Sequence, residues 1–328
     1  MPVPPCTCAG PGFCPRYQRD MPGRLFELCQ TRADCRQLWD QSFTGAPGES
    51  APAPAAVNDA LAHRNGVLAA PAPPRFQPRP DDPPCGVVLG SYALPRLIEL
   101  QIRLIRDTCG PVPILVADDC SPGFGRPVDP ASAYGRLQEV CARSPGVTLW
   151  PNVERIGHTG GDVAVFWKGL VWAGATGLRV LAKLSQRFLL DLPRWLQDGA
   201  WELLTSRLPL ACRRCRGPEN FPLRTEGCLL DVACWGRPEV LHDLTPRRYG
   251  RGTFAETVLD AALRRHFGGV FWPWDVYSED RYQSAPGLIW HCADASARYA
   301  AVAARYGLSL DPDFHTGGWG RQPNYVYG

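Results

Sequence analysis

The sequence has no strong net charge, no apolar run suited to a membrane and no basic, apolar stretch at its start. Its 35 Lys and Arg nearly balance its 32 Asp and Glu, a formal charge of +3, so it has no electrostatic footprint for nucleic acid. The most apolar stretch, residues 163–184, contains Lys168 and Arg179 and is interrupted by Gly174 and Gly177, which favours a helix followed by a strand over a transmembrane segment. Residues 1–5 do not resemble a secretory signal. We therefore expect a soluble, cytoplasmic protein.

Cysteine is abundant, with 14 residues. Because no oxidising compartment is implied, these thiols are expected to be reduced, buried or metal-bound. Residues 1–44 form a Cys-rich leader that is too short to fold on an apolar core, and four thiolates around a structural zinc can hold such a segment. Its candidate zinc ligands are Cys6, Cys8, Cys14 and Cys29. Unpaired thiols in a flexible tail are the alternative.

Residues 45–84 are rich in Pro and Ala and poor in large apolar side chains, which predicts a semi-rigid linker. The domain that follows is expected to span residues 85–328. Inside it, Cys212 and Cys215 form a CxxC, with Cys228 and Cys234 further along. A zinc knuckle is one interpretation. The other is that Cys228 and Cys234, which lie in apolar runs, act as small hydrophobic side chains.

A strand, a helix and a second strand open this domain. Residues 86–91 are a short apolar run, residues 94–105 repeat apolar side chains at helical spacing, and residues 114–117 are apolar enough for a buried parallel strand. Asp118 and Asp119 follow directly, with Ser121 two residues on. In open α/β sheets ligands bind at the carboxyl ends of the strands, so these side chains are binding candidates. A simple turn is the alternative, because Asp and Ser are common turn formers.

The segments VVLGSY and ILVADDCSPG, with the amphipathic helix between them, resemble the opening of a family 2 type glycosyltransferase of the GT-A fold. The resemblance extends through most of residues 85–328 and is strongest before residue 190. It implies an α/β fold with a central mixed, mostly parallel sheet flanked by helices. It also implies that Asp118 and Asp119 bind the nucleoside of a nucleotide sugar, such as a UDP- or GDP-sugar, and that Ser121 belongs to the same nucleotide-sugar site.

A glycine-rich segment, NVERIGHTGGDV, precedes the next expected helix. Asp162 is a candidate amino-terminal cap of that helix, and the exposed amides near Gly160 and Gly161 suit a phosphate. An ordinary glycine-rich turn explains the same residues, since there is no Walker or dinucleotide fingerprint. The resemblance places this segment at the rim of the active site. His158 is then a candidate for the pocket, although a single His is more often structural.

The strand at residues 178–190, LRVLAKLSQRFLL, lacks the Asp-x-Asp with which family members hold a divalent metal against the donor pyrophosphate. Lys183 and Arg187 stand in this region instead, and their two cations can neutralise phosphates without a metal. The alternative is that both are solvated or paired with Asp118, Asp119 or Asp191. The need for a divalent metal therefore stays open.

Glu256 lies in the first turn of a helix expected over residues 251–267. The resemblance makes it the general base that removes a proton from the acceptor hydroxyl; a stabilising interaction with the helix dipole explains it without chemistry. His291 resembles a late metal ligand of some GT-A enzymes, and His315 is an alternative.

Together these observations predict a glycosyltransferase of the hexosyltransferase type. Its partners would be a nucleotide sugar and a glycan or other hydroxyl acceptor, and its role the synthesis of a polysaccharide or glycoconjugate. The alternatives are an inactive GT-A-fold protein that binds a nucleotide or glycan, and a nucleotidyltransferase. Against the latter, no glycine-rich phosphate loop with a basic residue follows the first strand.

Overall fold

The computed structural model describes residues 12–14, 19–21, 76–119, 127–154, 156–214, 223–249, 253–274, 288–289 and 295–310. The chain divides into two compact units. The first contains a short antiparallel pair, β1 (Gly12–Cys14) and β2 (Arg19–Met21). The second begins at Pro73 and contains all other described elements.

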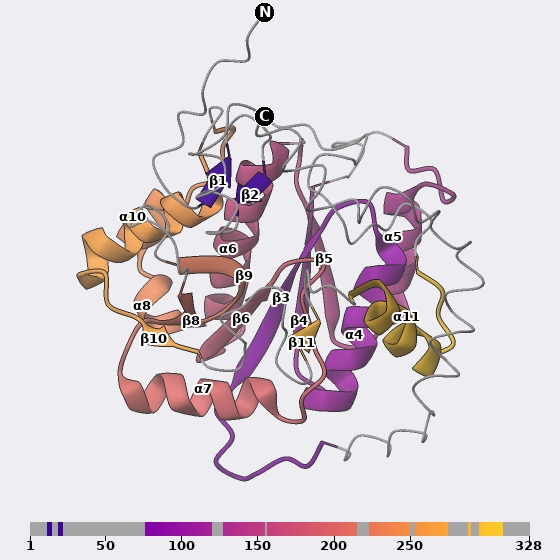
Figure 1. Cartoon of the computed structure of the whole chain (residues 1–328), viewed down its shortest axis with the longest axis horizontal. Helices are drawn as coiled ribbons and strands as arrows, with labels where there is room; N and C mark the ends of the chain where they lie inside the picture. The colour runs from indigo at the N-terminus through magenta and orange to yellow at the C-terminus, as the bar shows by residue number, and fades with distance from the viewer. Residues whose placement is uncertain are drawn as a thin grey trace, which may run out of the picture. The chain divides into compact units, whose positions relative to one another are not determined.

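A seven-stranded sheet forms the centre of the second unit (Figure 1). Its strands are β3 (Cys85–Ser91), β4 (Ile114–Asp118), β5 (Val147–Pro151), β6 (Val180–Leu184), β8 (Leu210–Arg214), β9 (Leu223–Asp231) and β10 (Trp272–Pro273). Their order is β10-β8-β9-β6-β3-β4-β5, and β9 alone runs antiparallel to its neighbours in this sheet. The expected central mixed, mostly parallel sheet is confirmed.

Helices cover both faces of the sheet, as the apolar strands require. One core is built on α4 (Pro95–Cys109), α5 (Ala133–Ala142) and α7 (Trp195–Ser206). The opposite core is built on α6 (Gly157–Ala175), α8 (Val232–Trp235), α9 (Pro238–Asp243) and α10 (Ala255–Phe267). Strand alternation divides the residues between them: Val87 and Leu89 of β3 face the first core, and Val88 faces the second.

A third apolar cluster joins α4 to the end of the described chain. It contains residues of α4, of the short strands β7 (Leu189–Leu190) and β11 (Leu288–Ile289), and of α11 (Ala295–Arg305). β7 and β11 pair antiparallel, and Arg305 forms an ion pair with Asp191 at 2.8 Å. Across the described ranges, no helix has the length and apolarity needed to cross a membrane.

Helix α4 begins and ends where the local sequence predicts. Pro95 occupies the first turn of α4, where its missing N–H costs nothing, and Gly110 follows the helix with φ of 73°. The expected strands at residues 86–91 and 114–117 and the helices at 94–105 and 251–267 are present, with small shifts at their ends.

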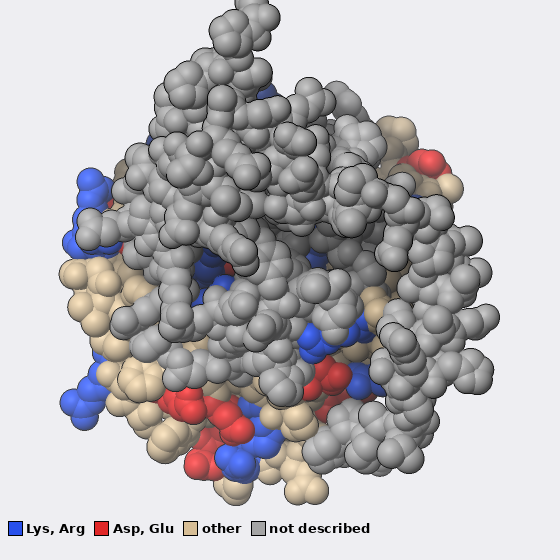
Figure 2. Space-filling model, in the orientation of Figure 1, with Lys and Arg blue, Asp and Glu red and all other residues tan. Residues whose placement is uncertain are grey.

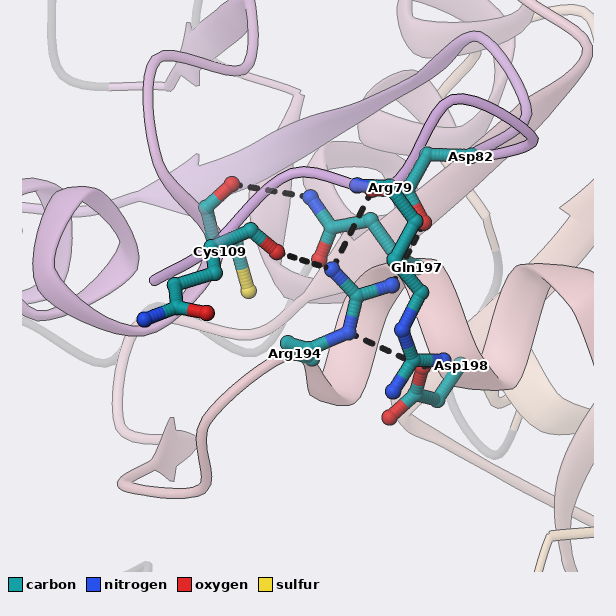
Figure 3. Close-up of polar contacts among 7 residues, drawn as sticks. Arg79, Asp82, Cys109, Arg194, Gln197 and Asp198 are labelled. Carbon is teal, nitrogen blue, oxygen red and sulfur yellow. Dashed lines mark hydrogen bonds and ion pairs between the residues drawn. The ribbon is translucent and has the colours of Figure 1, made fainter. Parts of the chain in front are cut away.

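Residues 76–84, which the sequence assigned to the linker, are part of the second unit, and their Arg79 and Asp82 lie beside Arg194 and Asp198 (Figure 3). Arg194, just before α7, bonds Asp82 through Nη2 to Oδ1 at 2.5 Å and Nη1 to Oδ2 at 3.2 Å. The same guanidinium lies 5.6 Å from the ring centroid of Phe76 and also donates to the Gln77 carbonyl. The carbonyl of Pro84 accepts from the backbone N–H of Arg179 at 2.7 Å. We call these residues, 76–84, the strap, and we propose that the folded domain begins before Phe76.

Candidate functional site

The carboxyl ends of β3 and β4 lie side by side, because the strands are parallel and Ser91 is in register with Asp118. The next residue, Asp119, donates its backbone N–H to the Ser91 carbonyl at 3.2 Å. The prediction that both aspartates end a central parallel strand is confirmed. This edge of an open α/β sheet is where ligands bind, so the candidate site is built here.

Asp118 and Ser91 face the side of the sheet covered by α5. Asp118 is 2% exposed, and its charge, after burial, raises the pKa of Tyr134 on α5. The Ser91 hydroxyl is also buried and has no hydrogen-bond partner among the described residues. A buried hydroxyl normally has a partner, so Ser91 is a binding candidate that the sequence did not reveal. A single Ser at a strand end carries no signal by itself.

Asp119 has a different surrounding from Asp118 and holds the loop before α6. Its Oδ1 accepts from Asn152 Nδ2 at 2.7 Å and from the Ile156 backbone N–H at 3.2 Å. Burial raises the pKa of Asp119, while these bonds and that from the Gly157 N–H act in the opposite direction. Its carboxylate is therefore the anion at the amino terminus of α6. The expectation that Asp162 caps this helix is wrong, because α6 begins at Gly157 and Asp162 lies inside it.

The glycines of α6 permit close approaches. A Cβ at Gly160 would lie 2.5 Å from the Arg247 carbonyl oxygen, and one at Gly161 would lie 3.2 Å from Asp119 Oδ2. These contacts account for both glycines by packing, so their contact with a phosphate stays a prediction.

Several predicted site residues lie outside the described residues: Ser121, Cys6, Cys8, Cys29, Cys215, His291 and His315. For His158 and Cys14 only the backbone is described, in α6 and β1. Their roles stay predictions.

Lys183 is not available to a phosphate, which corrects the prediction made for it. Its side chain is 0% exposed, and its ammonium donates to Asp162 Oδ1 at 2.8 Å, Ser185 Oγ at 3.0 Å and the Thr225 carbonyl at 2.7 Å. An ammonium has three N–H groups, and all three are used. Lys183 lies on the side of β6 that faces α6 and α10, and the sequence gave no hint that a carboxylate lies there.

The turn after β6 is where the resemblance to family 2 type glycosyltransferases would place an Asp-x-Asp. Gln101 holds it by donating to the carbonyls of Ser185 at 3.0 Å and Phe188 at 2.9 Å, and the Arg187 carbonyl accepts from the Tyr299 hydroxyl. Ser185, Gln186 and Arg187 offer no carboxylate, so this turn does not fit a divalent cation, which prefers charged oxygen ligands. Arg187 is partly exposed and stays the candidate cation for the donor phosphates.

Residues of three elements surround Glu256 in the first turn of α10. The Thr225 hydroxyl of β9 donates to Glu256 Oε1 at 3.2 Å. Burial raises the pKa of Glu256 to about 7, and the charges of Glu226 and Asp162 act in the same direction. A carboxyl group with such a pKa can exchange a proton near neutral pH. The sequence analysis did not single out Glu226 and took Asp162 for a helix cap, because their approach to Glu256 depends on how β9, α6 and α10 pack together and not on the local sequence.

Two cysteines of the proposed second zinc site, Cys212 and Cys228, are packed in the sheet. Cys212 and Cys228 are cross-strand partners of β8 and β9, and both are fully buried; burial raises the pKa of the Cys228 thiol to about 12. Within the described ranges, no group of three or more His, Cys, Asp or Glu is placed to hold a metal ion. Cys212 and Cys228 therefore act as small core side chains.

A groove of about 750 Å³ lies at the opposite ends of the strands, away from the carboxyl ends of β3 and β4. Its walls include Pro84, Gly174, Leu178 and Arg179, near the amino ends of β3 and β6. Amino ends of parallel strands are not where open α/β sheets bind ligands, so this groove is not taken as the site. On the face shown in Figure 2, the visible acidic and basic side chains are intermixed.

No family model matches this sequence, and no curated protein matches it. Among solved structures, similarity is found to the glycosyltransferase GlyE of Streptococcus pneumoniae TIGR4, with 14% identity, a TM-score of 0.39, and coverage of 60% of this chain and 46% of that one. Another is the mannosyltransferase PcManGT of Pyrobaculum calidifontis, in complex with GDP-Man and Mn²⁺, with 14% identity, a TM-score of 0.39, and coverage of 64% and 60%. A third is a cytidylyltransferase from Leptospira borgpetersenii, with 9% identity, a TM-score of 0.29, and coverage of 46% and 61%.

The matches thus span less than two thirds of each of these proteins' own length. The similar structures also include the galactosyltransferase LgtC and mouse xyloside xylosyltransferase 1. At these identities and TM-scores the similarity does not assign the chain to a family.

Proposed function

We propose that the chain is a glycosyltransferase that transfers a sugar from a nucleotide sugar to a hydroxyl acceptor, with Glu256 as the general base. The observation that carries the proposal is the Glu256 carboxyl group, whose pKa is raised to about 7 by burial, Glu226 and Asp162. Above that pH the carboxylate accepts the proton of the acceptor hydroxyl. The acceptor oxygen then bonds to the sugar C1, the bond from C1 to the phosphate oxygen breaks, and the nucleoside diphosphate leaves.

The nucleoside would lie at the carboxyl ends of β3 and β4. Asp118 and the Ser91 hydroxyl are buried there in register, and they offer an acceptor and a donor to the ribose or base. Asp119 fixes the loop beside them, and Arg187 would face the pyrophosphate. A UDP- or GDP-sugar suits this arrangement, and a glycan in polysaccharide or glycoconjugate synthesis is the acceptor class that we propose.

The test compares Glu256→Gln with the wild type. A nearly isosteric, neutral side chain cannot accept the proton, so turnover should fall about 10²–10⁴-fold with little change in donor affinity. Calorimetry with UDP, GDP and their sugars identifies the donor first, and product formation is then measured with that donor. Glu239→Gln is the matched control, because Glu239 is also a first-turn glutamate but is exposed on α9. Full turnover in Glu256→Gln refutes the proposal.

One observation favours a second candidate, a nucleotide- or glycan-binding protein without catalysis. The turn Ser185–Arg187 offers no carboxylate for the metal that assists catalysis in Asp-x-Asp enzymes. Binding of a nucleotide sugar without turnover, under Mg²⁺ and Mn²⁺ alike, would support this candidate.

We also propose that the leader, residues 1–44, binds zinc through Cys6, Cys8, Cys14 and Cys29. The measurement is metal content by elemental analysis of the full chain and of a variant with these four cysteines changed to Ser. Equal zinc in both proteins contradicts the proposal.

A further inference from the structure

Lys183 joins two segments that are far apart in the sequence. Its ammonium is fully buried and donates to Asp162 on α6 and to the Thr225 carbonyl on β9. It also lies 4.9 Å from the ring centroid of Phe166, on the same side of the sheet. A buried ion pair costs desolvation that its attraction only partly offsets, so stability alone is a weak reason for this lysine.

The contacts continue from Lys183 to Glu256 through one residue. Thr225 is 1% exposed; its carbonyl accepts from Lys183 at 2.7 Å, and its hydroxyl donates to Glu256 Oε1 at 3.2 Å. Because the ammonium fixes the backbone of Thr225, it also fixes the direction from which that hydroxyl reaches Glu256. Four elements, β6, α6, β9 and α10, therefore meet around one carboxyl group.

The charged side chains around Glu256 come from α6, β9 and β6. Asp162 of α6 and Glu226 of β9 disfavour its ionisation, and Arg224 of β9 favours it. Lys183 of β6 pairs with Asp162 at 2.8 Å and so compensates one of the two opposing carboxylates. Removing the ammonium would leave Asp162 as an uncompensated charge.

We propose that Lys183 and Thr225 are positioning residues for Glu256: the buried ammonium compensates Asp162 and holds Thr225, whose hydroxyl orients the Glu256 carboxylate. This inference rests on the proposed function, in which Glu256 is the base. It assigns to Lys183 a role in proton transfer in place of phosphate binding.

The decisive variants are Thr225→Val, which keeps the shape and removes the hydroxyl, and Thr225→Ser, which keeps the hydroxyl. The Glu256 carboxyl is titrated by NMR in full-length protein labelled with ¹³C in glutamate, and its signal is assigned by its loss in Glu256→Gln. A hydrogen bond to a carboxylate favours ionisation, so Thr225→Val should raise the pKa of Glu256 by about one unit, and Thr225→Ser should restore it. Turnover at about pH 6 should fall about tenfold in Thr225→Val, and the acidic side of the pH–rate profile should move to higher pH.

Lys183→Met provides a second measurement. Loss of the ammonium should raise the pKa of Glu256 further; if this variant does not fold, the two Thr225 variants decide. A wild-type titration in Thr225→Val overturns the inference, whether or not the protein transfers a sugar. A shifted titration in a protein that turns over no nucleotide sugar supports the positioning of Glu256 and refutes the proposed function, so the two failures are distinguishable.

Discussion

Replacing Asp82 by Asn tests whether the strap is part of the folded domain. Asp82 is far from the candidate base in sequence and takes no part in the proposed chemistry. Its carboxylate receives two hydrogen bonds from Arg194, at 2.5 and 3.2 Å, and the two side chains are 19% and 12% exposed. Figure 3 shows Arg194 between the strap and α7. The substitution keeps the shape of the side chain and removes its charge.

The magnitude follows from the geometry. Hydrogen bonds to charged groups contribute about 1.5–3 kcal/mol, and solvent screening near the surface reduces this value. We expect a loss of about 1.5 kcal/mol in the free energy of unfolding. For a domain of this size that corresponds to a decrease in Tm of roughly 3–6 °C.

The pH dependence has a defined sign. Arg194 lowers the pKa of Asp82 in the folded protein, so the stabilisation is present above the unfolded pKa and is lost as the pH falls through the folded pKa. Thermal unfolding followed by circular dichroism should therefore show a difference between Asp82→Asn and wild type at neutral pH that shrinks in acid. Asp81→Asn is the control, because Asp81 is exposed and should change Tm little. Equal melting of the two variants at neutral pH would refute the strap's role.

Three further predictions concern the site and α6. Asp118→Asn should weaken nucleotide binding about tenfold with little change in Tm, measured by calorimetry and thermal unfolding; unchanged binding contradicts the nucleoside site. Gly160→Ala should lower Tm, because its Cβ would lie 2.5 Å from a carbonyl oxygen. Gly174 lies in the same helix, but a Cβ there would have no atom within 4 Å, so Gly174→Ala should raise the free energy of unfolding by up to about 1 kcal/mol. Equal effects of the two substitutions would refute the packing argument. Because the pKa of Glu256 is raised to about 7, its contribution to stability is lost as pH rises through that value, so Glu256→Gln should melt higher than wild type above neutral pH and equally at about pH 4. A lower Tm at every pH would contradict the raised pKa.

The sequence by itself determined the opening βαβ unit and the position of the paired aspartates. Apolar runs and helical spacing are local signals, and Pro95 and Gly110 mark the ends of α4 by their backbone geometry. A strand that is buried on both faces must be apolar throughout, so its carboxyl end at Asp118 was readable. The helical spacing of apolar side chains likewise predicted that Glu256 lies in the first turn of α10.

The roles of the individual side chains were decided by the tertiary structure. Asp118 and Asp119 are adjacent in sequence, yet strand alternation directs them to opposite faces of the sheet, Asp118 toward α5 and Asp119 toward the amino end of α6. Asp119 is the anion at that helix end, and so a phosphate is not needed to account for it.

Lys183 shows most clearly what the local sequence could not determine. On the sequence it stands beside Arg187 as one of two cations, but the pairing of β6 with β9 places Cys228 opposite it and Thr225 within reach. Burial of an ammonium requires acceptors, and Asp162 and Thr225, from segments before and after it in the chain, provide them. The register of an antiparallel strand is a long-range property, because it depends on which strands meet and on the packing of α6 and α10 over them, so the local sequence could not determine the partner of this lysine.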